Sequence, residues 1–226
     1  MNIGGNNKQM ISNFTKDLKQ ETIITNYVYD ILFENYFDKK FKSESLLITD
    51  IKSQMKGIDI LMKDLKNNKS IKFDLKSQST YINNPLPTFA LEVLYNNKNN
   101  QDKLGWFIND ELETQFYGFI WIHKAELTNG NIISKDDFKK IEIMFVKKDK
   151  IIQELKNMGL NKEKIIDVSN EMRLEGKDTK IINNVKFRLT KNLQEKPVNI
   201  VLRKSFYKKI CVQHFMIENH KANLIK

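Results

Sequence analysis

Two short stretches decide the fold of this chain: GIDILM at residues 57–62 and IKFDLKSQ at residues 71–78. In the second stretch every other residue is apolar, and this period of two sends apolar and polar side chains to opposite faces of a strand. In the first stretch Asp59 stands between isoleucines, where a carboxylate is costly unless it binds a partner. The sequence therefore predicts two strands with one apolar face for a core and one polar face for a site.

The polar segment between these strands, residues 63–70, contains an Asn-Asn pair and is typical of a turn, so an antiparallel hairpin is expected. Residue numbers of facing pairs in such a hairpin have a constant sum, and facing residues share a face of the sheet. Several turn lengths fit the sequence with an odd sum, and the residue that they place opposite Asp59 is Asp74, Lys76 or Gln78. Any odd sum gathers these polar side chains on one surface, whereas an even sum sends Asp59 to the other surface.

Composition sets the class of protein. The 226 residues are 40% hydrophobic and 10% aromatic, which suits one sizeable domain or a core with an extension and argues against disorder. The net charge of +10 favours nucleic acid as a partner, although a codon bias toward Lys, Asn and Ile is an alternative explanation. A single cysteine, Cys211, excludes an internal disulfide and a cysteine-based zinc cluster. No apolar run approaches the ~20 residues of a membrane span, and residues 1–9 lack a secretion signal, so a soluble cytoplasmic protein is expected.

A long helix is expected at residues 13–37, capped by Asn13 or Thr15. At the helical period, Glu21 falls inside the apolar stripe of this helix, whereas Glu34 falls on the outer side. A carboxylate on a buried helix face is unusual, which makes Glu21 a functional candidate. The alternative is that Glu21 favours the helix N-terminus through the macrodipole.

The rest of the chain predicts an α/β protein with a mixed central β-sheet flanked by helices. Strands are expected at residues 45–51, 88–95, 104–108, 116–122, 141–146, 185–190 and 197–207. Helices are expected at residues 150–158, 162–174 and, in the tail, 213–226.

Asp59 and the Asp74-Leu75-Lys76 triplet supply the residue types that metal-dependent phosphodiester hydrolysis needs. Two carboxylates on neighbouring strands can hold Mg²⁺ together with water and a phosphate oxygen. Such an ion polarises the phosphate and lowers the pKa of a bound water. A lysine on the same face can orient or help deprotonate that water, or stabilise charge that builds on the phosphate. Two acids and an amine that converge on one point therefore indicate phosphodiester chemistry.

At these residues the chain resembles the PD-(D/E)XK, or restriction-endonuclease-like, nuclease superfamily. Asp59 matches the first acid of the family pattern, and Asp74-Leu75-Lys76 matches the acid-x-lysine of the next strand. Gln78 matches a polar residue that some branches carry after the lysine, and Glu21 matches the glutamate of a preceding helix. The family has proline before the first acid, where this chain has Ile58.

The resemblance implies a metal-dependent DNA endonuclease of restriction, repair or mobile-element type. It implies Mg²⁺ or Mn²⁺ held by Asp59, Asp74 and Glu21, with Lys76 and Gln78 completing the catalytic set. The third acid is left open among Glu21, Glu34 and Glu92. DNA is favoured over RNA as the substrate, and a homodimer is a further expectation, because superfamily members that cut both strands are often dimers. The alternatives are a protein of the same fold that binds nucleic acid without cutting it and a structural protein.

Residues 1–158 are accordingly predicted to form the nuclease-like core, and residues 159–226 a basic C-terminal α+β extension packed on it. The extension carries the cations that we expect to contact phosphates: Lys186, Arg188, Arg203, Lys204, Lys208 and Lys209. Trp106 is expected either to stack on a base or to pack in the core.

Overall fold

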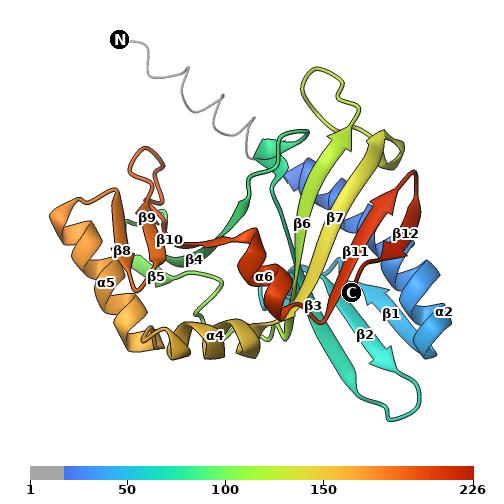
Figure 1. The fold of residues 1–226 in the computed structure, drawn as a ribbon, viewed down its shortest axis with the longest axis horizontal. Helices are drawn as coiled ribbons and strands as arrows, with labels where there is room; N and C mark the ends of the chain where they lie inside the picture. The colour runs from blue at the N-terminus through green and yellow to red at the C-terminus, as the bar shows by residue number, and fades with distance from the viewer. Residues whose placement is uncertain (1–17) are drawn as a thin grey trace.

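The computed structural model describes residues 18–226, which form two β-sheets with helices around them (Figure 1). The predicted class, a mixed α/β protein, is confirmed. A seven-stranded sheet has the order β1-β2-β3-β6-β7-β11-β12, and a five-stranded sheet has the order β5-β4-β10-β9-β8. Both sheets combine strands from either side of residue 158, where the sequence predicts a division between core and extension.

The strands of the first sheet are β1 (Ser43–Leu47), β2 (Ile60–Asp64), β3 (Ser70–Ser77), β6 (Phe116–Ala125), β7 (Phe138–Lys147), β11 (Gln213–Glu218) and β12 (Lys221–Leu224). Those of the second sheet are β4 (Thr88–Asn96), β5 (Asp102–Leu104), β8 (Thr179–Ile182), β9 (Val185–Leu189) and β10 (Val198–Arg203). The helices are residues 18–28, η1 (Tyr29–Phe37), α2 (Asp38–Phe41), α3 (Ile51–Gln54), η2 (Ser79–Tyr81), η3 (Lys135–Asp137), α4 (Lys148–Asn157), α5 (Lys162–Glu175) and α6 (Lys204–Ile210).

The seven-stranded sheet is mixed because β3 and β6 run parallel, while its other neighbours pair antiparallel. Between β3 and β6 the chain leaves this sheet to form β4 and β5 of the second sheet. The end of β3 is therefore the point at which the chain crosses from one sheet to the other.

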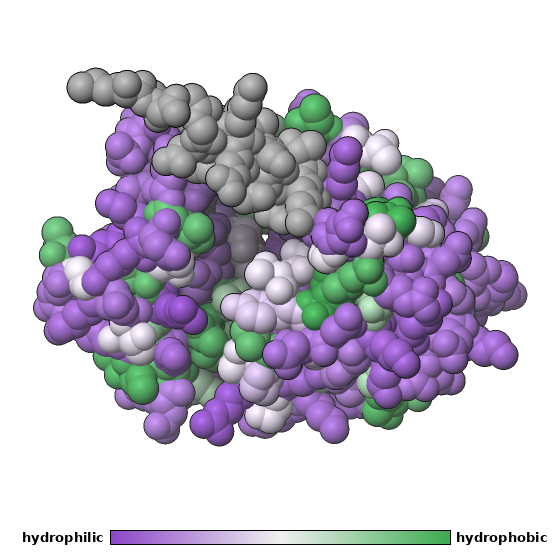
Figure 2. Space-filling view, turned by 90° about the horizontal axis from the view of Figure 1, so that it is seen from above, coloured by the Kyte–Doolittle hydropathy of each residue, from purple (hydrophilic) through white to green (hydrophobic). Residues whose placement is uncertain are grey.

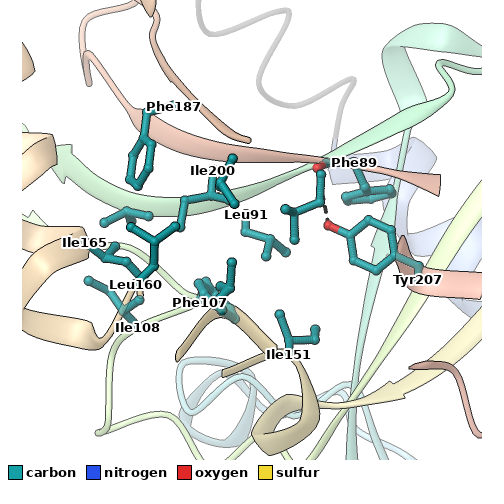
Figure 3. Packing of buried hydrophobic residues seen from close by; sticks show 14 of the residues in the cluster. Phe89, Leu91, Phe107, Ile108, Ile151, Leu160, Ile165, Phe187, Ile200 and Tyr207 are labelled. Carbon is teal, nitrogen blue, oxygen red and sulfur yellow. Dashed lines mark hydrogen bonds between the residues drawn. The ribbon is translucent and has the colours of Figure 1, made fainter. Parts of the chain in front are cut away.

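Strand β6 is buried on both faces, as its nearly continuous apolar run indicates. On one face, Ile120 and Ile122 pack with Phe33 and Phe37 of the N-terminal helix. On the other face, the side chains of Tyr117, Phe119 and Trp121 pack into a cluster that the second sheet and helices α4 to α6 complete. Figure 3 shows part of this second cluster, in which the Tyr207 hydroxyl donates a hydrogen bond to the Phe89 carbonyl at 3.3 Å.

The N-terminal helix departs from the predicted periodicity. Its turns widen to a π-helix over Tyr29–Phe37, so a period of 3.6 residues no longer describes which side chains face the sheet. Tyr27, which precedes this widened segment, is only 2% exposed and packs on Phe138. The expected caps, Asn13 and Thr15, lie outside the described residues.

Three predicted elements are corrected. The strand expected at residues 197–207 ends at Arg203, where α6 begins, and the strand expected at residues 104–108 ends at Leu104. The tail is a hairpin of β11 and β12 and not a helix. Its turn has positive φ at Asn219 and His220, which is the backbone that a tight hairpin turn requires.

None of the helices within residues 18–226 has both the length and the apolar character needed to cross a bilayer.

Candidate active site between the two sheets

The β2–β3 hairpin has the odd register that the sequence predicts. Ile60 faces Phe73 in the last pair of the ladder. Beyond that pair the Asp59 N–H donates to the Phe73 carbonyl at 2.8 Å, so the regular pairing stops short of Asp59. The register is the one of the three compatible with the sequence that sets Asp59 against Asp74, and the two carboxyl groups lie beside each other.

The carboxyl group of Asp74 is buried beside that of Asp59. Asp74 is 2% exposed, and its Oδ1 accepts from the Lys76 ammonium at 2.8 Å. Asp59 Oδ2 accepts from the Leu75 N–H at 2.7 Å, which fixes this carboxylate against β3. Among the described residues, Asp74 Oδ2 is buried without a hydrogen-bond partner. Two adjacent carboxylates with an unsatisfied oxygen need a shared proton or a cation between them.

The charges of this group are strongly coupled. Burial raises the pKa of Asp74 to about 7, the Lys76 ammonium opposes this rise, and the Asp59 carboxylate adds to it. Burial alone would lower the pKa of Lys76, but Asp74 and Asp59 together raise it above its ordinary value. Lys76 is therefore a cation at neutral pH, and its single charge does not balance both acids.

Lys76 also contacts the aromatic side of the site. Its ammonium lies 5.0 Å from the ring centroid of Trp106, which packs edge-on against Tyr117 at 5.0 Å. A Cβ on Gly105 would lie 2.4 Å from the Glu92 carbonyl, so this glycine lets the Trp106 segment approach β4. Trp106 thus packs in the wall of the site, and the Lys76 ammonium lies over its ring.

Glu92, one of the candidates for the third acid, lies close to this group. Burial raises its pKa, while a hydrogen bond to the Trp106 backbone and the charge of Lys76 oppose the rise. Glu34, another candidate, is exposed on the N-terminal helix and does not line the cleft described below.

Glu21 reaches the same region from the N-terminal helix, although not from a buried position. The expected burial of Glu21 is wrong: Glu21 and Leu18 are exposed and border an open cleft. The charge of Glu21 contributes to the raised pKa of Lys76. The structure therefore brings Glu21, Asp59 and Lys76 to one cleft.

Gln78 is 9% exposed, and both ends of its amide bind backbone. Its Nε2 donates to the Thr88 carbonyl at 2.5 Å, and its Oε1 accepts from the Leu86 N–H at 2.8 Å. These bonds hold the crossing from β3 to β4 in place next to Lys76.

A cleft of about 870 Å³ lies between the two sheets. Asp59 and Lys76 line it from the first sheet and Glu21 from the N-terminal helix, while Trp106, next to β5, and Arg188 line it from the second sheet. Figure 2 shows the surface hollowed between the two parts of the molecule. The cleft thus places a cation across from the acids, as a site for an anionic substrate requires.

The donors present fit a hard divalent ion only with help from water or substrate. Within residues 18–226, no three His, Cys, Asp or Glu side chains are arranged to hold a metal. Mg²⁺ suits one or two carboxylates plus waters and phosphate oxygens, and the unsatisfied Oδ2 of Asp74 beside Asp59 offers that set.

The six cations predicted to contact phosphates do not form one cluster. Lys186, Arg188, Arg203 and Lys209 line a second groove, whereas Lys208 is exposed outside it. Lys204 is engaged by the protein itself: its partly buried ammonium pairs with Glu142 at 2.5 Å.

The sequence patterns missed the polar group around Lys204. Both oxygens of the buried Glu142 are occupied, one by His214 at 2.9 Å and the other by Lys204 and by His123 at 2.7 Å. Trp121 and His123 are two residues apart in β6, as are Glu142 and Met144 in β7, and this spacing was the signal that could have placed each pair on one face of its strand.

Comparisons of the chain with protein-family models, curated proteins and solved structures found no match.

Proposed function

We propose that the protein is a nuclease that uses a divalent metal ion to hydrolyse phosphodiester bonds at Asp59, Asp74 and Lys76. The supporting observation is the unsatisfied, buried Asp74 Oδ2 next to Asp59. A buried acid whose pKa is raised this far destabilises the folded protein at neutral pH, and such groups concentrate at functional sites. The hairpin register, the spacing of acid and lysine and the open cleft all agree with the PD-(D/E)XK arrangement.

Each side chain has a role in this proposal. Asp59 and Asp74 would hold the ion, which when bound supplies charge stabilisation for the phosphate and a water of lowered pKa. Lys76, fixed by Asp74 and Trp106, would orient the attacking water and stabilise charge on the phosphate. Because the pKa of Lys76 is raised, its ammonium would donate hydrogen bonds and would not act as the base that takes the proton of the water. Glu21, at the rim of the same cleft, would orient the metal through water.

DNA is the favoured substrate in this proposal because the resemblance to PD-(D/E)XK nucleases implies it, while the net charge of +10 suits either nucleic acid. A second candidate is a protein that binds nucleic acid without cutting it. The observation that favours this second candidate is that the described residues include no third acid arranged for a metal.

The test is cleavage of supercoiled plasmid and of circular single-stranded DNA by the purified protein in Mg²⁺, in Mn²⁺ and in EDTA. The variant is Lys76→Ala, and the matched control is Lys72→Ala. Lys72 is on the same face of β3, but it pairs with Glu113 and does not line the cleft. We expect metal-dependent cleavage that Lys76→Ala lowers by ~10²-fold or more, the usual size of such a contribution, and that Lys72→Ala leaves nearly unchanged. No cleavage by the unaltered protein in either metal would favour the binding protein.

A further inference from the structure

A second groove continues the cleft across the five-stranded sheet. It measures about 710 Å³, and it shares Thr88, Arg188 and Val201 with the cleft that contains Asp59 and Lys76. The two hollows therefore meet at Arg188. This continuity matters because a chain-like substrate bound at the acids could extend into the second groove.

The lining of this second groove is cationic. Four cations, Lys186, Arg188, Arg203 and Lys209, line it, and no Asp or Glu among the described residues does. The first three have no ion pair within residues 18–226, and Lys209 is 3.8 Å from Glu154 with its side chain 75% exposed. Lysines elsewhere are often neutralised, as Lys72 is by Glu113 and Lys180 by Glu171. The groove is thus a region of uncompensated positive charge that would attract a polyanion.

The strand register explains why these cations share one surface. In β9 the exposed Lys186 and Arg188 alternate with buried Val185, Phe187 and Leu189. Arg188 pairs with Asn199 of β10, and both line the cleft. Val185, Phe187 and Leu189 belong to the buried cluster, where Figure 3 shows Phe187, so the cations face away from the core.

Apolar side chains lie between the cations. Phe206, Met158 and the exposed Ile181 line the same groove. Proteins that bind single-stranded nucleic acid without sequence preference combine a cationic groove with aromatic side chains on which bases stack, and Phe206 is the aromatic residue that lines this groove. The lining of this groove has both parts.

The volumes of the cleft and of the second groove favour a single-stranded substrate over a duplex. The cleft, about 870 Å³, is within the range of ~300–1,000 Å³ typical of pockets for small ligands. A duplex is too thick to enter such a space, since its major groove alone is wide enough to admit an α-helix. An extended single strand does, since its sugar-phosphate chain and unstacked bases can follow a narrow groove.

We propose that the groove binds one single-stranded segment of nucleic acid, which runs from the acids past Arg188 to Lys186 and Arg203. This inference rests on the proposed function and names its substrate class: single-stranded nucleic acid, or the single-stranded part of a flap or overhang.

The experiment measures binding without cleavage. Labelled single-stranded DNA, single-stranded RNA and duplex DNA of equal length are titrated with the protein in EDTA, with fluorescence anisotropy as the readout. The groove variant is Lys186→Glu/Arg188→Glu. The matched control is Lys66→Glu/Lys69→Glu, which makes the same charge change in the exposed β2–β3 turn, distant from β9 in Figure 1. Thermal unfolding of both variants shows whether they are folded.

We expect single strands to bind at least tenfold more tightly than duplex, and the groove variant to lose at least tenfold while the control changes less than about threefold. The slope of log affinity against log salt should fall by roughly 1.4 in the groove variant, about 0.7 for each phosphate of a single strand that the protein no longer neutralises. The DNA and RNA arms identify which strand is preferred, and tighter binding of either over duplex supports the inference.

Duplex binding as tight as single-strand binding would overturn the proposed substrate class. Equal losses in the groove and control variants would overturn the groove as the binding surface, since net charge would then explain the affinity. Both failures differ from failure of the nuclease proposal, which would appear as intact binding with no metal-dependent cleavage.

Discussion

Asp74 is the residue on which the proposed chemistry depends most. Its carboxyl is 2% exposed, and its pKa is raised to about 7 from an ordinary value of 3.8. A core position filled only for stability would carry an apolar side chain, because a buried acid costs free energy that its single lysine partner offsets only in part. An acid at position 74 is explained if its carboxylate binds a ligand.

Replacing this acid with its neutral isostere should therefore stabilise the metal-free protein. The folded state holds the proton of Asp74 more tightly than the unfolded state does, so the free energy of unfolding decreases as pH rises from about 4 to about 7. Asp74→Asn removes that decrease. In EDTA we expect the variant to gain stability over the unaltered protein as pH rises, by on the order of 4 kcal/mol at pH 8, since a pKa difference of one unit is worth ~1.4 kcal/mol.

The measurement is urea unfolding from pH 5 to pH 8, with Asp167→Asn as a control that makes the same change at an exposed helical site. The stability difference between Asp74→Asn and the unaltered protein should widen with pH, and that of the control should stay flat. A constant difference for Asp74→Asn would mean that Asp74 is ionised in the folded protein at all these pH values.

At the scale of elements, local patterns predicted most of the first sheet. The alternation in β3, the parity of the β2–β3 register and the apolar runs of β6 and β7 are properties of short segments, and the structure bears them out. The second sheet could not be predicted in the same way. Its strands β4 and β10 lie more than a hundred residues apart in the chain, and no local pattern encodes that pairing.

The candidate site likewise has a part that local sequence patterns predict and a part that depends on the packing of distant elements. The placement of Asp59 and Asp74 on one face follows from the odd parity of one hairpin, and that parity was predicted from the sequence. The exposure of Glu21, the engagement of Lys204 by Glu142 and the position of Arg188 on the cleft depend on how distant elements pack, so the sequence alone did not reveal them.

Substitution of Gly118 in β6 tests whether stability and cleavage depend on the exact position of β3. It faces Leu75 in the parallel β3–β6 pair, and a Cβ at this position would lie 2.5 Å from Leu75 Cδ2 and 3.1 Å from Phe145. Overpacking of this kind usually costs about 1–3 kcal/mol. Gly118→Ala should therefore lower the unfolding free energy by that amount and, because Leu75 lies between Asp74 and Lys76, also slow cleavage.

Gly130→Ala is the comparison, since a Cβ there has no described neighbour within 4 Å and only the positive φ of 75° is strained. Its stability cost should come without any change in cleavage rate. Equal cleavage rates for Gly118→Ala and the unaltered protein would show that the strand tolerates displacement beside the acids.

At the scale of the whole molecule, the chain crosses between its two sheets directly beside the site. Strand β3 ends at Ser77, Gln78 fixes the following turn, and β4 begins the second sheet at Thr88. Lys204, at the start of α6, ties the second sheet back to β7 through Glu142. The acids and Arg188 of the second sheet are therefore tied together by two connections between the sheets.

A crystal structure of the protein soaked with Mn²⁺, with the anomalous signal locating the metal, would decide whether the two acids form a metal site. We expect a peak between the carboxylates of Asp59 and Asp74, at about 2.0–2.3 Å from an oxygen of each, the range for hard divalent ions. The next nearest acid, Glu21 or Glu92, would then be the third member of the site. Mn²⁺ bound elsewhere, or no metal at these two carboxylates at saturating concentration, would contradict the proposed metal-dependent nuclease.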